Sequence, residues 1–121
     1  MFGWFKPKLP PEEEMHRNRR LYRESVLRKI NSLDRYGRQI CRMQVLVEHA
    51  EFLNEFVMPS KFSALSPEER SLYLMRLGER SRVYEQRREY KSALGVDAFA
   101  VWLDCLCFDE LEEAKQFWDA L

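Results

Sequence analysis

The stretch between Pro11 and Pro59 contains no proline, and its apolar residues recur every seven positions. One row of this repeat consists of Val26, Leu33, Ile40 and Val47, and a second row consists of Tyr22, Tyr36, Met43, Ala50 and Val57, with Lys29 as its polar exception. A repeat sustained over about five heptads is typical of a helix that packs along a coiled-coil interface. The pattern therefore predicts a single long helix over residues 11–57.

The start of this segment has the features of a helix N-terminus, and Gly37 is its one weak point. Pro11 suits the first helical turn, and the following Glu12–Glu14 run places negative charge at the positive end of the helix dipole. A glycine costs about 1 kcal/mol in a helix interior, which does not by itself end a helix. The heptad phase also continues through Gly37, so the sequence favours one unbroken helix of about 70 Å in an elongated molecule.

Further helices are predicted after residue 65. The sequence Ser66-Pro67-Glu68-Glu69 is a capping box that begins a helix ending near Leu94, with Gly95 as a C-terminal cap. Asp97 could cap a third helix over 98–108, and Asp109 a short last helix; one bent helix over 97–121 is the alternative. We expect residues of the apolar third helix to be buried, namely Val101, Trp102, Leu103, Cys105, Leu106 and Phe108.

The predicted fold class is therefore all-α. It comprises a long N-terminal helix packed with two or three further helices in an elongated bundle with coiled-coil character. Residues 11–121 form one helical domain, and residues 1–10 form an extended arm that carries Phe2, Trp4 and Phe5. These aromatic side chains either fold back onto the domain core or bind a partner or a membrane surface.

Charge is unevenly distributed along a chain whose net charge is zero. Residues 15–42 hold nine Lys or Arg and two acids, whereas residues 96–121 hold seven acids and one Lys. The two segments could pack together and neutralise each other, or the basic one could bind an anionic partner. The candidate anion-binding residues lie on one face of the first helix: Arg17, Arg20, Arg28, Arg35, Arg38 and Arg42.

No pattern in the sequence indicates a catalytic centre, a metal site or a cofactor. Cys105 and Cys107 are two residues apart and would point in different directions on a helix, unlike the paired ligands of zinc sites. The four glycines are not clustered as in a phosphate-binding loop. Three cysteines do not form a disulfide framework, and no secretory signal or membrane-spanning run is visible, so a cytoplasmic location is expected.

The sequence therefore favours a non-enzymatic protein–protein interaction module, such as an adaptor, an assembly factor or an inhibitor. A protein partner would bind along the helical repeat, at Leu33 and Ile40, or at the aromatic arm, and homo-oligomerisation is possible. The alternative is a helical protein that binds nucleic acid through its arginine face. An enzyme that uses a cysteine is the least favoured of the three classes.

Overall fold

The computed structural model describes residues 11–56 and 64–121, and every element in these ranges is a helix. The elements are α1 (Pro11–Asn31), α2 (Arg35–Phe56), α4 (Pro67–Gln86), α5 (Tyr90–Cys107) and α6 (Leu111–Ala120). None of these helices is both long enough and apolar enough to cross a membrane. The prediction of an all-α bundle is confirmed. The aromatic arm with Phe2, Trp4 and Phe5 lies outside the described residues.

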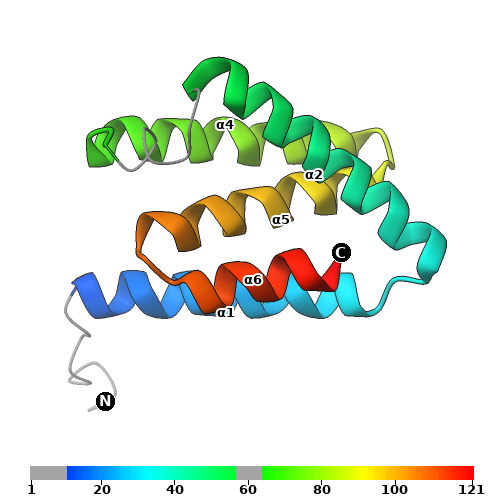
Figure 1. Cartoon of the computed structure of the whole chain (residues 1–121), viewed down its shortest axis with the longest axis horizontal. Helices are drawn as coiled ribbons and strands as arrows, with labels where there is room; N and C mark the ends of the chain where they lie inside the picture. The colour runs from blue at the N-terminus through cyan, green and yellow to red at the C-terminus, as the bar shows by residue number, and fades with distance from the viewer. Residues whose placement is uncertain (1–10, 57–63) are drawn as a thin grey trace, which may run out of the picture.

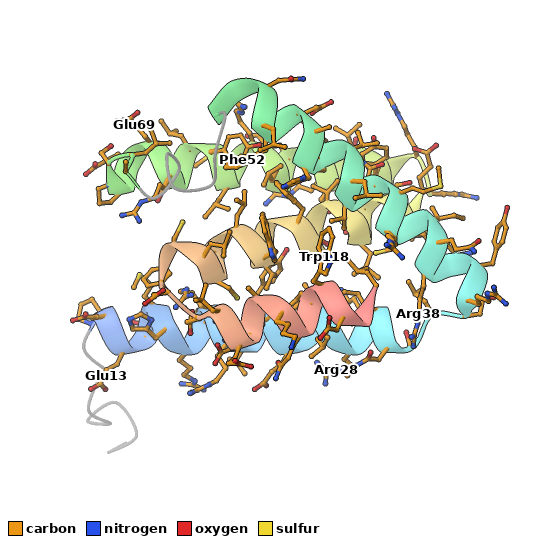
Figure 2. All side chains as sticks on the ribbon, in the orientation of Figure 1. Glu13, Arg28, Arg38, Phe52, Glu69 and Trp118 are labelled. Atoms are coloured by element: carbon orange, nitrogen blue, oxygen red, sulfur yellow. The ribbon has the colours of Figure 1, made fainter. Side chains whose placement is uncertain are left out.

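Helix α5 is the centre of the bundle, and α1, α2, α4 and α6 all pack against it. Figure 1 shows α5 between α4 and α1, with α2 crossing it at an angle. The core is made largely by α5, which supplies the buried Val96, Phe99, Val101 and Leu103. Phe52 of α2 stacks edge-to-face on Phe99, and Trp118 of α6 lies against Trp102 (Figure 2).

The predicted continuous helix over residues 11–57 is wrong, because the chain turns between Asn31 and Arg35 and reverses direction (Figure 1). Asp34 caps the start of α2, since its Oδ1 accepts a hydrogen bond from the Gly37 amide at 2.7 Å. Arg38 donates to the carbonyl oxygens of Leu33 and Asn31 and so satisfies the end of α1. These local hydrogen bonds outweigh the cost of interrupting the heptad repeat.

Helix α4 begins as predicted but ends earlier. The Ser66 hydroxyl accepts a hydrogen bond from the Glu69 amide at 3.2 Å, which confirms the capping box. The helix stops at Gln86, and Arg88 adopts a left-handed conformation with φ of 61°. Gly95 is therefore not a cap but lies inside α5. A Cβ atom at this position would come within 2.6 Å of the Cys41 carbonyl oxygen, so glycine permits α2 and α5 to cross closely.

The end of the chain also differs from the prediction. Asp97 lies in the middle of α5 rather than at a helix start, and Asp109 occupies a left-handed turn with φ of 57° before α6. Of the residues expected to be buried in this region, Val101, Leu103 and Cys105 are buried, and Trp102 and Leu106 are half-buried. Phe108 was predicted to be buried, but it lies beyond the last core turn and is 40% exposed.

Candidate functional site

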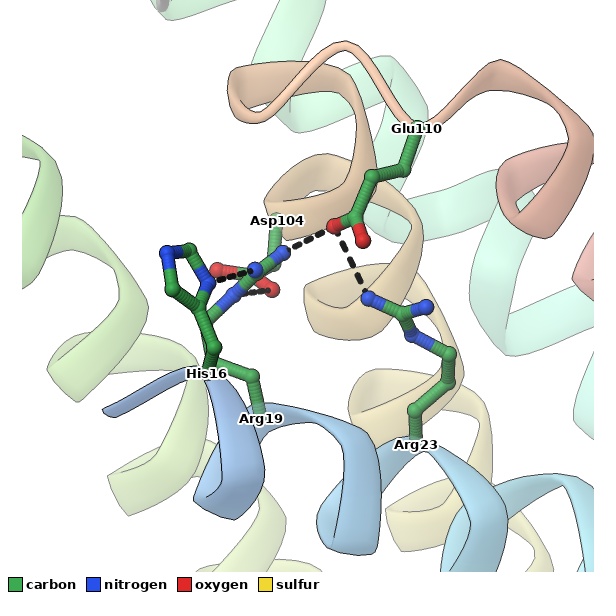
Figure 3. Close-up of polar contacts among 5 residues, drawn as sticks. All are labelled: His16, Arg19, Arg23, Asp104 and Glu110. Atoms are coloured by element: carbon green, nitrogen blue, oxygen red, sulfur yellow. Dashed lines mark hydrogen bonds and ion pairs between the residues drawn. The ribbon is translucent and has the colours of Figure 1, made fainter. Parts of the chain in front are cut away.

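An ionic cluster, formed by Arg19, Arg23, Asp104 and Glu110, joins α1 to the end of α5 and the start of α6 (Figure 3). Arg19 Nε lies 2.7 Å from Asp104 Oδ2, and a second nitrogen of the same guanidinium donates to Glu110 Oε1. Arg23 Nη2 reaches that same oxygen at 2.9 Å. The basic first helix therefore lies against the acidic C-terminal segment. This agrees with the hypothesis that the two segments pack together and neutralise each other.

The guanidinium of Arg19 is also enclosed by aromatic groups. Its Cζ atom lies 3.5 Å from the centre of the Phe108 ring, which is a cation–π contact. Its Nη1 donates to His16 Nδ1 at 3.0 Å, and the His16 ring meets Phe108 edge-on. The side chain of Arg19 is only 11% exposed, so this cluster fixes α1 to the bundle.

Burial and pairing act on the two carboxyl groups of this cluster to different extents. Burial raises the pKa of Glu110, but hydrogen bonds and charge from Arg19 and Arg23 outweigh it, and its pKa lies below the usual value. Burial dominates at Asp104, and its pKa is raised despite its bond to Arg19. Arg19 thus compensates two carboxylates at once, which suits a structural clamp.

A second ionic cluster joins α2 to α4. Glu48 is 1% exposed and accepts hydrogen bonds from Gln44 Nε2 at 2.9 Å and from Arg80. Arg80 also pairs with the exposed Glu51 at 2.7 Å. Burial raises the pKa of Glu48, while the charge of Arg80 and the Gln44 hydrogen bond oppose that rise.

A groove runs along α5 between α1 and α4, two helices that hardly touch each other. It consists of three adjoining hollows of about 240, 230 and 380 Å³. The first two share Arg19, Leu74 and Asp104, and the last two share Asp97. We call this feature the α1–α4 groove, and its central hollow is lined by Arg19, Tyr22, Leu74, Gly78, Asp97, Ala100, Val101 and Asp104.

The outer face of α2 is a second candidate surface. It carries the large apolar residues Tyr36, Met43, Leu46, Val47 and Leu53, which are between 36% and 69% exposed. The opposite face of the same helix is buried in the core through Cys41, Val45 and Phe52. Helix α2 is therefore apolar on two sides, and the described residues cover only one of them.

The predicted partner-binding residues do not lie together on this outer face. Leu33 is in the turn between α1 and α2, where it is half-buried against the core, and Ile40 is half-buried beside the α4–α5 turn. Val26 is only 1% exposed. Val26, Leu33 and Ile40 of the first row are thus buried or half-buried, and the exposed large apolar residues of α2 lie on its outer face.

The six predicted anion-binding arginines separate into two groups because the helix is broken. Arg17, Arg20 and Arg28 are exposed on α1. The other three, Arg35, Arg38 and Arg42, line an open hollow of about 450 Å³ near Leu121. The α1 arginines that form ion pairs, Arg19 and Arg23, were not singled out from the sequence, although their four-residue spacing places them on one helix face.

The cysteine side chains have the properties of structural thiols. Cys41 and Cys105 are buried, and burial raises the pKa of each thiol to about 11. Cys107 is half-buried, and burial raises its pKa as well. No group of three or more potential metal ligands occurs in residues 11–56 and 64–121. No protein-family model, curated protein sequence or solved structure matches this chain.

Proposed function

We propose that the protein is a non-enzymatic interaction module that associates through the outer face of α2. The observation that carries this proposal is that α2 has large apolar side chains on two opposite faces. Its inner face is part of the core, while Tyr36, Met43 and Val47 on the outer face are each about half exposed or more. A row of large apolar side chains left in water favours association with another protein surface.

The charge order along α2 supports a second copy of this chain as the occupant of this face. The first half of the helix carries the exposed Arg35 and Arg42, and the second half carries the exposed Glu51, whereas Glu48 is buried against Arg80. Two copies in antiparallel order would place the basic half of one helix against the acidic half of the other. The recurrence of Tyr36, Met43 and Ala50 every seven residues suits such coiled-coil pairing. Because the contact uses the same surface twice, it closes as a dimer.

Light scattering of the intact protein tests this proposal. The wild type should have the mass of a dimer, and the double variant Met43→Asp, Val47→Asp should have the mass of a monomer. Both residues are exposed, so the variant should keep the helical circular dichroism of the wild type. Met75→Asp on α4 is the matched control, because Met75 is 57% exposed but lies on another helix. The control should remain a dimer.

Two results would overturn self-association through α2. One is a strictly monomeric wild type at high protein concentration. The other is a dimer that survives in the Met43→Asp, Val47→Asp variant, which would place the interface elsewhere.

The raised pKa values of the buried thiols support a non-enzymatic role, since a thiol with a pKa of about 11 is almost entirely protonated at neutral pH. A nucleophilic cysteine needs the thiolate form.

Nucleic-acid binding is the second candidate function, and the hollow lined by Arg35, Arg38 and Arg42 is the observation that favours it. Arginine forks bind phosphate oxygens well. Affinity for a nucleic acid that falls steeply with added salt, and that is lost in Arg35→Ala, Arg42→Ala, would support this function. Affinity that these substitutions leave unchanged would exclude the hollow as the binding site.

A further inference from the structure

The α1–α4 groove contains no residue of α2, so it is independent of the surface used for the proposed self-association. Three features of the groove indicate what could occupy it. They are a glycine that faces empty space, a carboxylate that lacks an ion pair, and room for another helix beside α5.

Gly78 has no packing reason to be glycine. It lies in the interior of α4, where glycine costs about 1 kcal/mol relative to alanine. A Cβ atom at Gly78 would meet nothing within 4 Å, in contrast to Gly95, where it would collide with α2. The space that Gly78 leaves open belongs to the central hollow of the groove. Glycine at this point allows the backbone of a bound chain to approach α4 closely.

Asp97 supplies a negative charge at the floor of the groove. Its carboxylate receives hydrogen bonds from the hydroxyl groups of Tyr22 and Ser81. Ser81 Oγ also lies 3.3 Å from the Ala93 carbonyl oxygen, and its single proton cannot serve both acceptors. Among the ion pairs between described residues, none includes Asp97, whereas Asp104 pairs with Arg19.

Burial raises the pKa of Asp97, and the charge of Glu85 raises it further, while that of Lys29 opposes the rise. Asp97 therefore has no ion-pair partner among the described residues, although Lys29 and Lys91 line the same hollow. A cation placed in the groove would compensate the charge of Asp97.

The helices around the groove leave one position of a bundle empty. Helices α1 and α4 run in the same direction on either side of α5, with the N-terminal half of each near the end of α5 (Figure 1). A fourth helix laid over α5 between them would complete a four-helix arrangement. The floor residues Ala93 and Ala100 are small, which permits the close approach that such packing needs.

We propose that the α1–α4 groove binds a helical segment of a partner protein, with a small apolar face and a central Lys or Arg that pairs with Asp97. A second charge contact follows from Arg70, which lines the groove beside Cys107. Residues 97 and 107 are separated by ten positions, or about 15 Å of helix. The segment therefore carries an acidic residue about three turns from its basic one.

A phage-displayed library of 18-residue helical peptides, selected on the whole protein, tests the proposal. Peptides enriched on the wild type should share one basic residue in an otherwise small apolar face. Gly78→Trp should abolish their binding, because a side chain at this position starts in open space and an indole should occupy the central hollow. Asp97→Asn should weaken binding at least about tenfold, since it removes one partner of a buried charge pair.

Gly78→Ala serves as the folding control, because it should bind nearly as the wild type and melt slightly higher. The proposal is overturned if no peptide prefers the wild type over Gly78→Trp. Selected peptides without a shared basic residue, or with equal affinity for Asp97→Asn, would overturn the assigned contact with Asp97. The Met43→Asp, Val47→Asp variant should bind the same peptides, so failure of self-association is distinguishable from failure of the groove.

Discussion

The two ionic clusters of this protein use the same chemistry in different surroundings. In the α1–α5–α6 cluster, Glu110 lies between Arg19 and Arg23, and its pKa is lowered. In the α2–α4 cluster, Glu48 is almost fully buried with one arginine and one amide, and its pKa is raised. The comparison teaches that an ion pair stabilises ionisation only when the pairing outweighs the loss of water.

The largest expected effect comes from removing the single cation of the α2–α4 cluster. Arg80→Ala would leave Glu48 buried without a charged partner and should lower the free energy of unfolding by about 3–5 kcal/mol in urea titrations. The double variant Arg80→Ala, Glu48→Gln should recover most of that loss. Arg82→Ala, at an exposed neighbouring position, should change stability by less than about 0.5 kcal/mol. Equal losses at Arg80 and Arg82 would show that Glu48 needs no partner.

Removing the central arginine of the α1–α5–α6 cluster should have a smaller effect. Arg19→Ala removes charged hydrogen bonds to Asp104 and Glu110 and the contact with Phe108, at a cost of about 2–3 kcal/mol. Arg23 still reaches Glu110, so one carboxylate keeps a partner. The exposed Arg20→Ala is the matched control and should be nearly neutral. A loss for Arg19→Ala larger than that for Arg80→Ala would reverse the comparison.

Glu110 and Glu48 should respond to pH in opposite directions. Because the folded pKa of Glu110 is lowered, its stabilising contribution is complete above its ordinary value of 4.5 and is lost as the pH falls through the folded value. Because the folded pKa of Glu48 is raised, stability instead decreases as the pH rises from 4.5 through that raised value. Melting temperatures measured across this range should lose the first dependence in Glu110→Gln and the second in Glu48→Gln. Unchanged profiles in both variants would contradict the assignment.

The smallest expected effect is that of the exposed member of the α2–α4 cluster. Glu51 is 55% exposed, so Glu51→Gln should cost at most about 0.5–1 kcal/mol and should become neutral at high salt. The cost of Arg80→Ala should persist at high salt, because Glu48 is shielded from ions. A cost for Glu51→Gln that salt does not reduce would indicate that this pair is more buried than the structure shows.

Part of the fold follows from the sequence because the signals are local. The capping box at Ser66 depends on four neighbouring residues, and the structure confirms it. The helical class follows from the apolar periodicity. The acidic C-terminal segment was matched to the basic first helix through charge alone, although the particular arginines, Arg19 and Arg23, were not identified.

The functional surfaces were less predictable, because the apolar spacing of a heptad repeat is the same whether its residues are buried or exposed in the folded chain. The sequence placed Tyr36, Met43 and Val47 in the heptad repeat, but their exposure on α2 depends on how that helix lies on α5. The α1–α4 groove had no sequence signal. Its lining comes from three helices, and Gly78 and Asp97 become candidate binding residues only because they line the same hollow.

The sequence by itself determined that this chain is helical, where α4 begins, and that basic and acidic segments can neutralise each other. Those properties depend on hydrogen bonds and charges within a few residues, or on composition. The helix break before Gly37 also has a local cause, whereas tertiary structure alone decided the role of Gly95. Gly37 lies in the first turn of α2, and its amide donates a hydrogen bond to the capping Asp34. Gly95 lies inside α5 at the point where α2 crosses, and the crossing leaves no room for a Cβ atom. Such a crossing brings together residues distant in the chain, and no local pattern records it.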